Sequence, residues 1–126
     1  MLVLVEKVPP DVEAKYNKYV QLRETLNAVV QERLNVEGTI AEIDSIVEKL
    51  RDLPENAELY RMFGYVLVKS TRDEVLNELN EKKEDLELRL KALKSQEESL
   101  KREIEKLGEE LKRLLSGRMG ATGIGG

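Results

Sequence analysis

LPENAELYRMFGYVLVKST, residues 53–71, decides the fold, because it interrupts a chain that otherwise has the pattern of long helices. Pro54 lacks an amide N–H and disfavours helical backbone in the residue before it, so a preceding helix must end here. From Leu59 to Val68 the residues are mostly aromatic, aliphatic or β-branched, and Gly64 divides them. This composition predicts two strands of about five residues joined by a tight turn near residues 63–64. Such a turn would pair Tyr60 with Leu67, Met62 with Tyr65, and Arg61 with Val66.

The predicted hairpin cannot be completed within one chain. A lone two-stranded hairpin is marginal in water, and this one has apolar residues on both faces and two unpaired edges. Several hairpins that pair edge to edge would close into a sheet and bury those faces. We therefore interpret the hairpin as a subunit-assembly module; the alternative is a hairpin folded back on its own coiled coil. The residues assigned to assembly are Leu59, Tyr60, Met62, Phe63, Gly64, Tyr65, Val66, Leu67 and Val68.

The segments on either side of the hairpin carry heptad repeats. Alternate steps of three and four along residues 12–50 meet ten apolar residues at twelve positions, and the same steps along residues 76–114 again meet ten at twelve. Repeats of this length predict two coiled-coil helices, which the short insert folds back into an antiparallel pair. That register brings Arg33 level with Glu97, and their pairing would fix the register more than it would add stability.

The sequence also predicts where the helices begin and where the chain loses order. Asp11 stands where the first helix should have its N-cap, and Thr71-x-x-Glu74 is a capping box for the second helix. Gly38 and Gly108 lie inside the helical patterns; we interpret them as tolerated drift, and the alternative is that they mark bends or loosened turns. The expected organisation is an apolar leader (1–10), a coiled coil (11–115) with a hairpin at about 58–70, and a disordered Gly-rich tail (116–126).

Composition argues against several classes of function. One Phe, no Trp and 37% charged residues among 126 residues give too little bulk for a globular core. The net charge of −4, with both signs interspersed, predicts neither a nucleic-acid partner nor a membrane surface. Cys and His are both absent, which removes disulfides, the commonest metal ligands and the usual general base. We therefore expect no enzyme activity, no catalytic residues, no metal and no cofactor.

The first ten residues, MLVLVEKVPP, bear on location. They lack the basic segment and the small-residue cleavage site of a secretory signal, and their apolar run is far too short to span a bilayer. The expected location is the cytoplasm.

Residues 59–64, LYRMFG, followed by residues 66–71, VLVKST, between two heptad helices resemble the β class of prefoldin subunits, most closely the archaeal ones. The pattern of that class is an aliphatic–Tyr–basic–x–x–Gly strand and then an aliphatic strand that ends in Lys and a hydroxyl residue. The resemblance covers about residues 10–115. It implies a mainly α-helical fold, a long antiparallel two-helix coiled coil with one central β-hairpin that joins an intersubunit β-barrel.

The resemblance also implies a function. Prefoldin is a hexamer of two α-class and four β-class subunits; it holds unfolded proteins at its coiled-coil tips without ATP and passes them to a group II chaperonin. The chain would then be a holdase subunit whose partners are α-class subunits, further copies of itself, unfolded clients and the chaperonin. A homo-oligomeric prefoldin-like assembly is a variant of this hypothesis. The alternative from another class is a coiled-coil scaffold or tether that docks one fixed protein.

The expected client-binding tip lies opposite the hairpin, where both ends of the chain should meet. On the first helix, the flank one position past the seam is apolar only in its N-terminal half, so it either widens the seam or forms an exposed apolar surface. The tip residues predicted from this reasoning are Leu2, Leu4, Val5, Val8, Tyr16, Val20, Leu111, Leu114 and Leu115.

Overall fold

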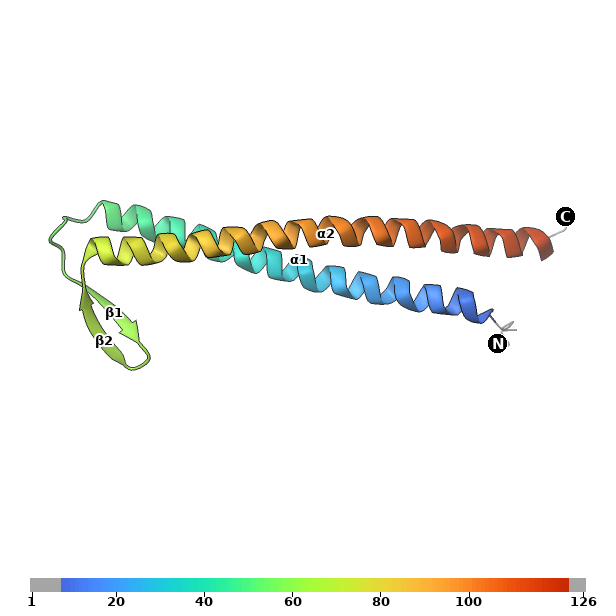
Figure 1. Cartoon of the computed structure of the whole chain (residues 1–126), viewed down its shortest axis with the longest axis horizontal. Coiled ribbons are helices and arrows are strands. Elements are labelled where there is room, and N and C mark those ends of the chain that lie inside the picture. Colours follow the sequence, from blue (N-terminus) through green and yellow to red (C-terminus); the bar gives the residue numbers. More distant parts are fainter. Residues whose placement is uncertain (1–7, 123–126) are drawn as a thin grey trace, which may run out of the picture. The chain divides into compact units, whose positions relative to one another are not determined.

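The computed structural model describes residues 8–122, with side chains described up to residue 117. Helix α1 spans Pro10–Arg51, strand β1 Leu59–Phe63, strand β2 Val66–Ser70, and helix α2 Arg72–Thr122 (Figure 1). The two strands form one antiparallel two-stranded sheet. The predicted fold, two long helices with a central β-hairpin, is confirmed.

The N-cap of helix α1 lies two residues earlier than the sequence suggested. The Glu13 N–H donates to the Pro9 carbonyl at 3.0 Å, so Pro9 is the N-cap and Pro10 the first helical residue. The prediction of Asp11 as N-cap was wrong, because proline is pre-organised for the first helical position and needs no N–H partner there. Asp11 lies within the first turn, where its negative charge suits the positive end of the helix dipole.

The chain leaves α1 through a tightened turn. The Leu53 N–H donates to the Leu50 carbonyl at 3.1 Å, a bond between residues three apart, as at many helix ends. Pro54 follows and prevents further helix, as predicted. The Arg72 Nη1 donates to the Leu53 carbonyl at 2.9 Å, so the first residue of α2 holds the exit of α1.

Helix α2 has the expected N-cap, but only the Thr71 half of the predicted capping box is observed, and the helix runs farther than expected at its end. The Glu74 N–H donates to the Thr71 hydroxyl at 3.1 Å, which confirms Thr71 as the N-cap. The Glu74 carboxylate accepts a hydrogen bond from the Ser70 hydroxyl at 3.1 Å and so ties the end of β2 to α2. The helix continues past Leu115 to Thr122. Residues 1–7 and 123–126 lie outside the described residues, and disorder of the tail stays a prediction.

The hairpin turn lies one residue later than predicted. Phe63 pairs with Val66, and Gly64 and Tyr65 form the two-residue turn. Gly64 has a φ of 56°, the positive value that both common two-residue hairpin turns need at their first central position. The predicted pairing was therefore wrong by two residues: Tyr60 faces Lys69, Met62 faces Leu67, and Arg61 faces Val68. Because side chains alternate with a period of two, each strand residue keeps its predicted face.

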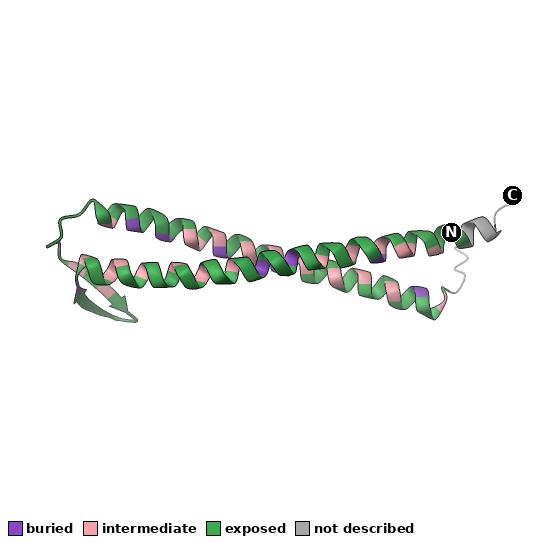
Figure 2. Cartoon of the chain, turned by 45° about the horizontal axis from the view of Figure 1, so that its top comes forward, coloured by how far each residue is buried: buried purple, intermediate pink, exposed green. Residues whose placement is uncertain are grey.

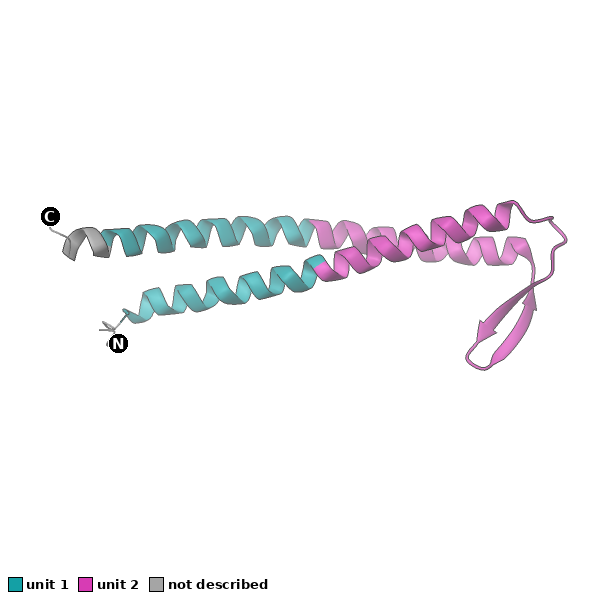
Figure 3. Cartoon of the chain, turned by 180° about the vertical axis from the view of Figure 1, so that it is seen from behind, with its two compact units in different colours: residues 1–30, 95–126 teal, residues 31–94 magenta. Residues whose placement is uncertain are grey.

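The helices pack as two compact units, shown in teal and magenta in Figure 3. Unit 1 combines residues 1–30 with 95–126, and unit 2 spans residues 31–94. In both units the predicted heptad positions of α1 and α2 are buried or half-buried at every place, which confirms the seam (Figure 2). The most enclosed seam residue is Leu93, which is 1% exposed.

Interhelical contacts give the register within each unit. In unit 2, Lys83 pairs with Asp44 at 2.5 Å, and Arg89 forms an ion pair with Glu32. In unit 1, the ring of Tyr19 lies against Gly108, where an added Cβ would approach Tyr19 Cε2 to 3.3 Å. Gly108 therefore lies under an aromatic ring, which favours a packing role for this glycine over its interpretation as drift.

The predicted pair between Arg33 and Glu97 stays a prediction. Arg33 belongs to unit 2, where it pairs with Glu37 at 2.8 Å. Glu97 belongs to unit 1, is 9% exposed and pairs with Lys101 at 3.0 Å.

Candidate functional site

The hairpin carries the largest collection of exposed apolar side chains on unit 2. Tyr65 at the turn is fully exposed and Met62 is 74% exposed, while Leu59 at the base is half-buried. Figure 2 shows the outer part of both strands as exposed. The exposed apolar and aromatic residues of the hairpin are Tyr60, Met62, Phe63, Tyr65, Val66, Leu67 and Val68.

The two faces of the hairpin differ in how they meet α2. The first face carries Arg61 and Ser70, which bond to Glu78 and Glu74 of α2, so this face is held at its base. The second face, formed by Tyr60, Met62, Leu67 and Lys69, remains open. The alternative of a hairpin folded back on its own coiled coil therefore applies only to the half away from the turn, and the part of the chain that the structure describes leaves the half nearer the turn exposed.

Unit 1 holds every described member of the predicted tip. The start of α1 and the end of α2 lie at the same end of this unit (Figure 1). Tyr16 is 51% exposed, and Val8, Val20 and Leu115 are also exposed. The seam residues Leu111 and Leu114 are half-buried, so they contribute to an apolar surface only at their outer edges. Leu2, Leu4 and Val5 lie outside the described residues.

The apolar flank of α1 contains both exposed and packed residues. Val30 is half-buried and widens the seam, whereas Tyr16 and Val20 in unit 1 and Leu34 in unit 2 are exposed. Part of this flank therefore widens the seam, and part of it is an exposed apolar surface.

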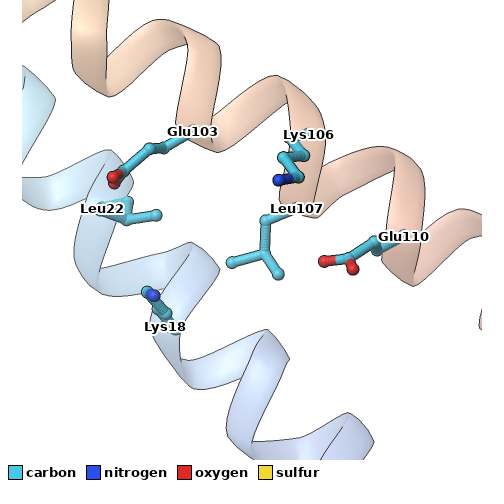
Figure 4. Close-up of a pocket in the computed structure, with 6 residues that line it drawn as sticks. All are labelled: Lys18, Leu22, Glu103, Lys106, Leu107 and Glu110. Carbon is cyan, nitrogen blue, oxygen red and sulfur yellow. The ribbon is translucent and has the colours of Figure 1, made fainter.

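A groove in unit 1 was missed by the sequence reasoning. It has a volume of about 240 Å³, with Leu22 of α1 and Leu107 of α2 at its floor (Figure 4). Both leucines are heptad positions, and the rim carries two positive and two negative side chains: Lys18, Lys106, Glu103 and Glu110. In the sequence these four charged residues have the pattern of an ordinary solvated coiled-coil flank. The groove is therefore seen only once the helices are placed in space.

Tyr19 of α1 packs against α2 next to Leu107 of this groove. Its ring is half-buried at a heptad position and lies against Gly108, the residue that follows Leu107. The guanidinium of Arg23, one turn farther along α1, is 5.8 Å from the centre of the ring. The sequence did contain a signal for this contact, because the predicted antiparallel register of the helices places Gly108 opposite Tyr19.

The seam of unit 2 contains two charges with defined partners, Arg33, which pairs with Glu37 on its own helix, and Lys83, which pairs across to α1. Lys83 occupies a heptad position, and its hydrogen bond to the Asp44 carboxylate raises the pKa of the ammonium above its ordinary value of 10.5. This pair serves the register of the helices, because it joins α2 to α1 at a heptad position.

Residues 8–122 contain neither a cluster of metal ligands nor a helix that could span a membrane. No cluster of three or more potential Asp or Glu ligands occurs among them, and none of their helices is long and apolar enough to cross a bilayer.

Comparison with known proteins accounts for this combination of two paired helices, an exposed hairpin and exposed apolar side chains on unit 1. Residues 13–118 match the family described as "Prefoldin subunit". The prefoldin subunit beta of Saccharolobus islandicus is 36% identical over 96% of this chain and 98% of its own length. That of Caldivirga maquilingensis is 32% identical over 93% of this chain and 97% of its own length.

A solved structure shows the same fold. The crystal structure of the prefoldin beta subunit from Thermococcus strain KS-1 matches 88% of this chain and 97% of its own chain, with a TM-score of 0.79 and 32% sequence identity. In this fold the β-barrel is formed between subunits, which explains why the hairpin is open within one chain. Membership supports a chaperone-type role and assembly with other prefoldin subunits. The chain therefore belongs to the prefoldin family, as a subunit of its β class.

Proposed function

We propose that this chain is a holdase subunit that captures unfolded proteins at the end of unit 1 and delivers them to a group II chaperonin without ATP. The observation that carries the proposal is the exposed apolar surface of unit 1, formed by Val8, Tyr16, Val20 and Leu115 at the end where α1 begins and α2 ends.

The chemistry of this surface suits a client without fixed shape. Exposed apolar groups gain about 25 cal/mol for each Å² that binding removes from water. The groove of Leu22 and Leu107 adds an open recess of about 240 Å³ in which apolar and charged side chains lie together. Its rim has groups that accept from peptide N–H groups and groups that donate to carbonyls. Each contact is weak, so retention would depend on several subunits acting together.

The assembly that provides this avidity is the second part of the proposal. The hairpins of two α-class and four β-class subunits pool into one barrel, and the coiled coils project from it. The expected location is the cytoplasm, where unfolded chains and a group II chaperonin are both available.

The test replaces the exposed apolar side chains of unit 1 and leaves the hairpin intact. Tyr16, Val20 and Leu115 are changed to Ser together, and a matched control changes the exposed Leu34 and Leu88 of unit 2 to Ser. Light scattering first establishes that both variants keep the mass of the assembly. Suppression of aggregation is then measured with two unrelated denatured proteins.

The expected result is a loss of suppression in the unit 1 variant alone, for both denatured proteins. If the unit 1 variant suppresses aggregation as well as the unit 2 control does, clients are held elsewhere. Binding of one native protein and neither denatured client would identify the chain as a scaffold instead. Transfer is tested separately, by adding a group II chaperonin and following release of the client.

A further inference from the structure

Two carboxylates one turn apart on α2 hold one face of the hairpin. Glu74 accepts from the Ser70 hydroxyl at 3.1 Å, and Glu78 pairs with Arg61 at 2.5 Å. Residues four apart on a helix lie on the same side, about 6 Å apart along its axis. Arg61 pairs with Val68 across the sheet, so Arg61 and Ser70 are diagonal neighbours on the same face. Glu74 and Glu78 on α2 can thus each reach one of these two neighbours on the hairpin.

Arg61 connects this attachment to the exposed end of the hairpin. Its guanidinium lies 4.7 Å from the centre of the Phe63 ring, on the same strand and face. The Arg61 side chain is 32% exposed, whereas Phe63 as a whole is 52% exposed. One side chain therefore contacts α2 through its charge and supports an exposed aromatic residue of the assembly surface through its planar group.

We propose that Arg61 is a positioning residue that sets the angle between the hairpin and α2 through Glu78. The attachment at Ser70 lies at the base and leaves the hairpin free to swing, whereas Arg61 adds a second point farther along the strand. Two separated points fix a direction, and a hairpin with a fixed direction loses less conformational entropy when it pairs with a neighbouring subunit. The inference concerns how the hairpin is presented and is independent of client capture.

The hairpin offers a matched control for this proposal. Lys69 and Glu58 also form an ion pair, at 3.4 Å, with side chains 66% and 65% exposed. Glu58 directly precedes β1 and Lys69 lies in β2, so this pair joins the hairpin to itself and makes no connection to α2. Its loss should leave the orientation of the hairpin unchanged.

The experiment measures orientation directly by electron spin resonance. The sequence contains no Cys, so spin labels at Tyr65→Cys and Glu84→Cys report the distance from the hairpin turn to α2 within unit 2. Labelled chains are diluted with unlabelled ones to suppress distances between subunits. The variants are Arg61→Met, Glu78→Gln, the charge swap of Arg61→Glu with Glu78→Arg, and the control Lys69→Met. Circular dichroism establishes that each keeps its helicity.

The parent and the control should give one narrow distance distribution. Arg61→Met and Glu78→Gln should broaden it, with an approximately two- to five-fold loss of the oriented population, as expected for an exposed ion pair. The parent should also broaden in 1 M salt, because added salt weakens the attraction between exposed charges such as these. The charge swap should restore most of the narrow distribution. An unchanged distribution in both single variants, or a swap that restores nothing, would overturn the proposal.

Discussion

Gly38 and Gly108 both lie inside long helices, and the structure predicts opposite outcomes when each is changed to Ala. Alanine in a helix interior is favoured over glycine by about 1 kcal/mol. A Cβ at Gly38 meets no atom within 4 Å, so Gly38→Ala should gain that amount in full. A Cβ at Gly108 would lie 3.3 Å from Tyr19 Cε2, so the ring must move by a few tenths of an ångström. Overpacking costs about 1–3 kcal/mol, which cancels or exceeds the gain.

The assay is thermal unfolding followed by circular dichroism at one fixed protein concentration, because assembly makes the midpoint depend on concentration. For a chain of this size, 1 kcal/mol shifts the melting temperature by about 4 °C. Gly38→Ala should therefore melt about 4 °C higher than the parent, and Gly108→Ala at the same temperature or lower. The double change of Gly108→Ala with Tyr19→Leu should recover part of the gain, because the smaller side chain no longer meets the added methyl group.

Equal stabilisation by the two single alanine variants would refute this reasoning. It would show that the Tyr19 ring is not seated against Gly108, and that the glycine is tolerated drift after all. A loss of stability in Gly38→Ala would instead show that this position is covered in the assembly.

Three further predictions concern the hairpin and the helix contacts. Changing Val66 and Val68 to Lys should dissociate the assembly in light scattering while helicity persists, and an unchanged mass would show that the hairpin is not the interface. The raised pKa of Lys83 means that its pairing with Asp44 stabilises the fold at neutral pH and is lost as the pH rises above 10.5 through the folded-state value. The free energy of unfolding in urea should thus fall less above that pH in Asp44→Asn than in the parent. Equal falls in the two proteins would contradict the pairing. Thr71→Ala should cost about 1 kcal/mol in the same assay, whereas Thr71→Ser should cost little.

The elements of this fold were readable from the sequence because they rest on local patterns. The heptad positions of both helices are enclosed wherever the pattern placed them, since a periodicity of three and four admits one buried stripe on a helix. Pro54 and Thr71 marked where α1 must end and where α2 could begin, because both act through their own backbone surroundings. The exposed hairpin followed from apolar faces that a single chain cannot cover.

Only the tertiary structure decided features that depend on pairing between distant residues. Two-residue hairpin turns accept a positive φ at more than one central position, so Gly64 permitted both the predicted turn and the observed one, and the pairing shifted by two residues. Arg61 reaches Glu78, and Tyr19 is seated against Gly108. A sequence pattern shows which face of an element is apolar, but it does not show which atoms of another element arrive there. That information requires the packed chain, because contact depends on side-chain direction and on the spacing between helices.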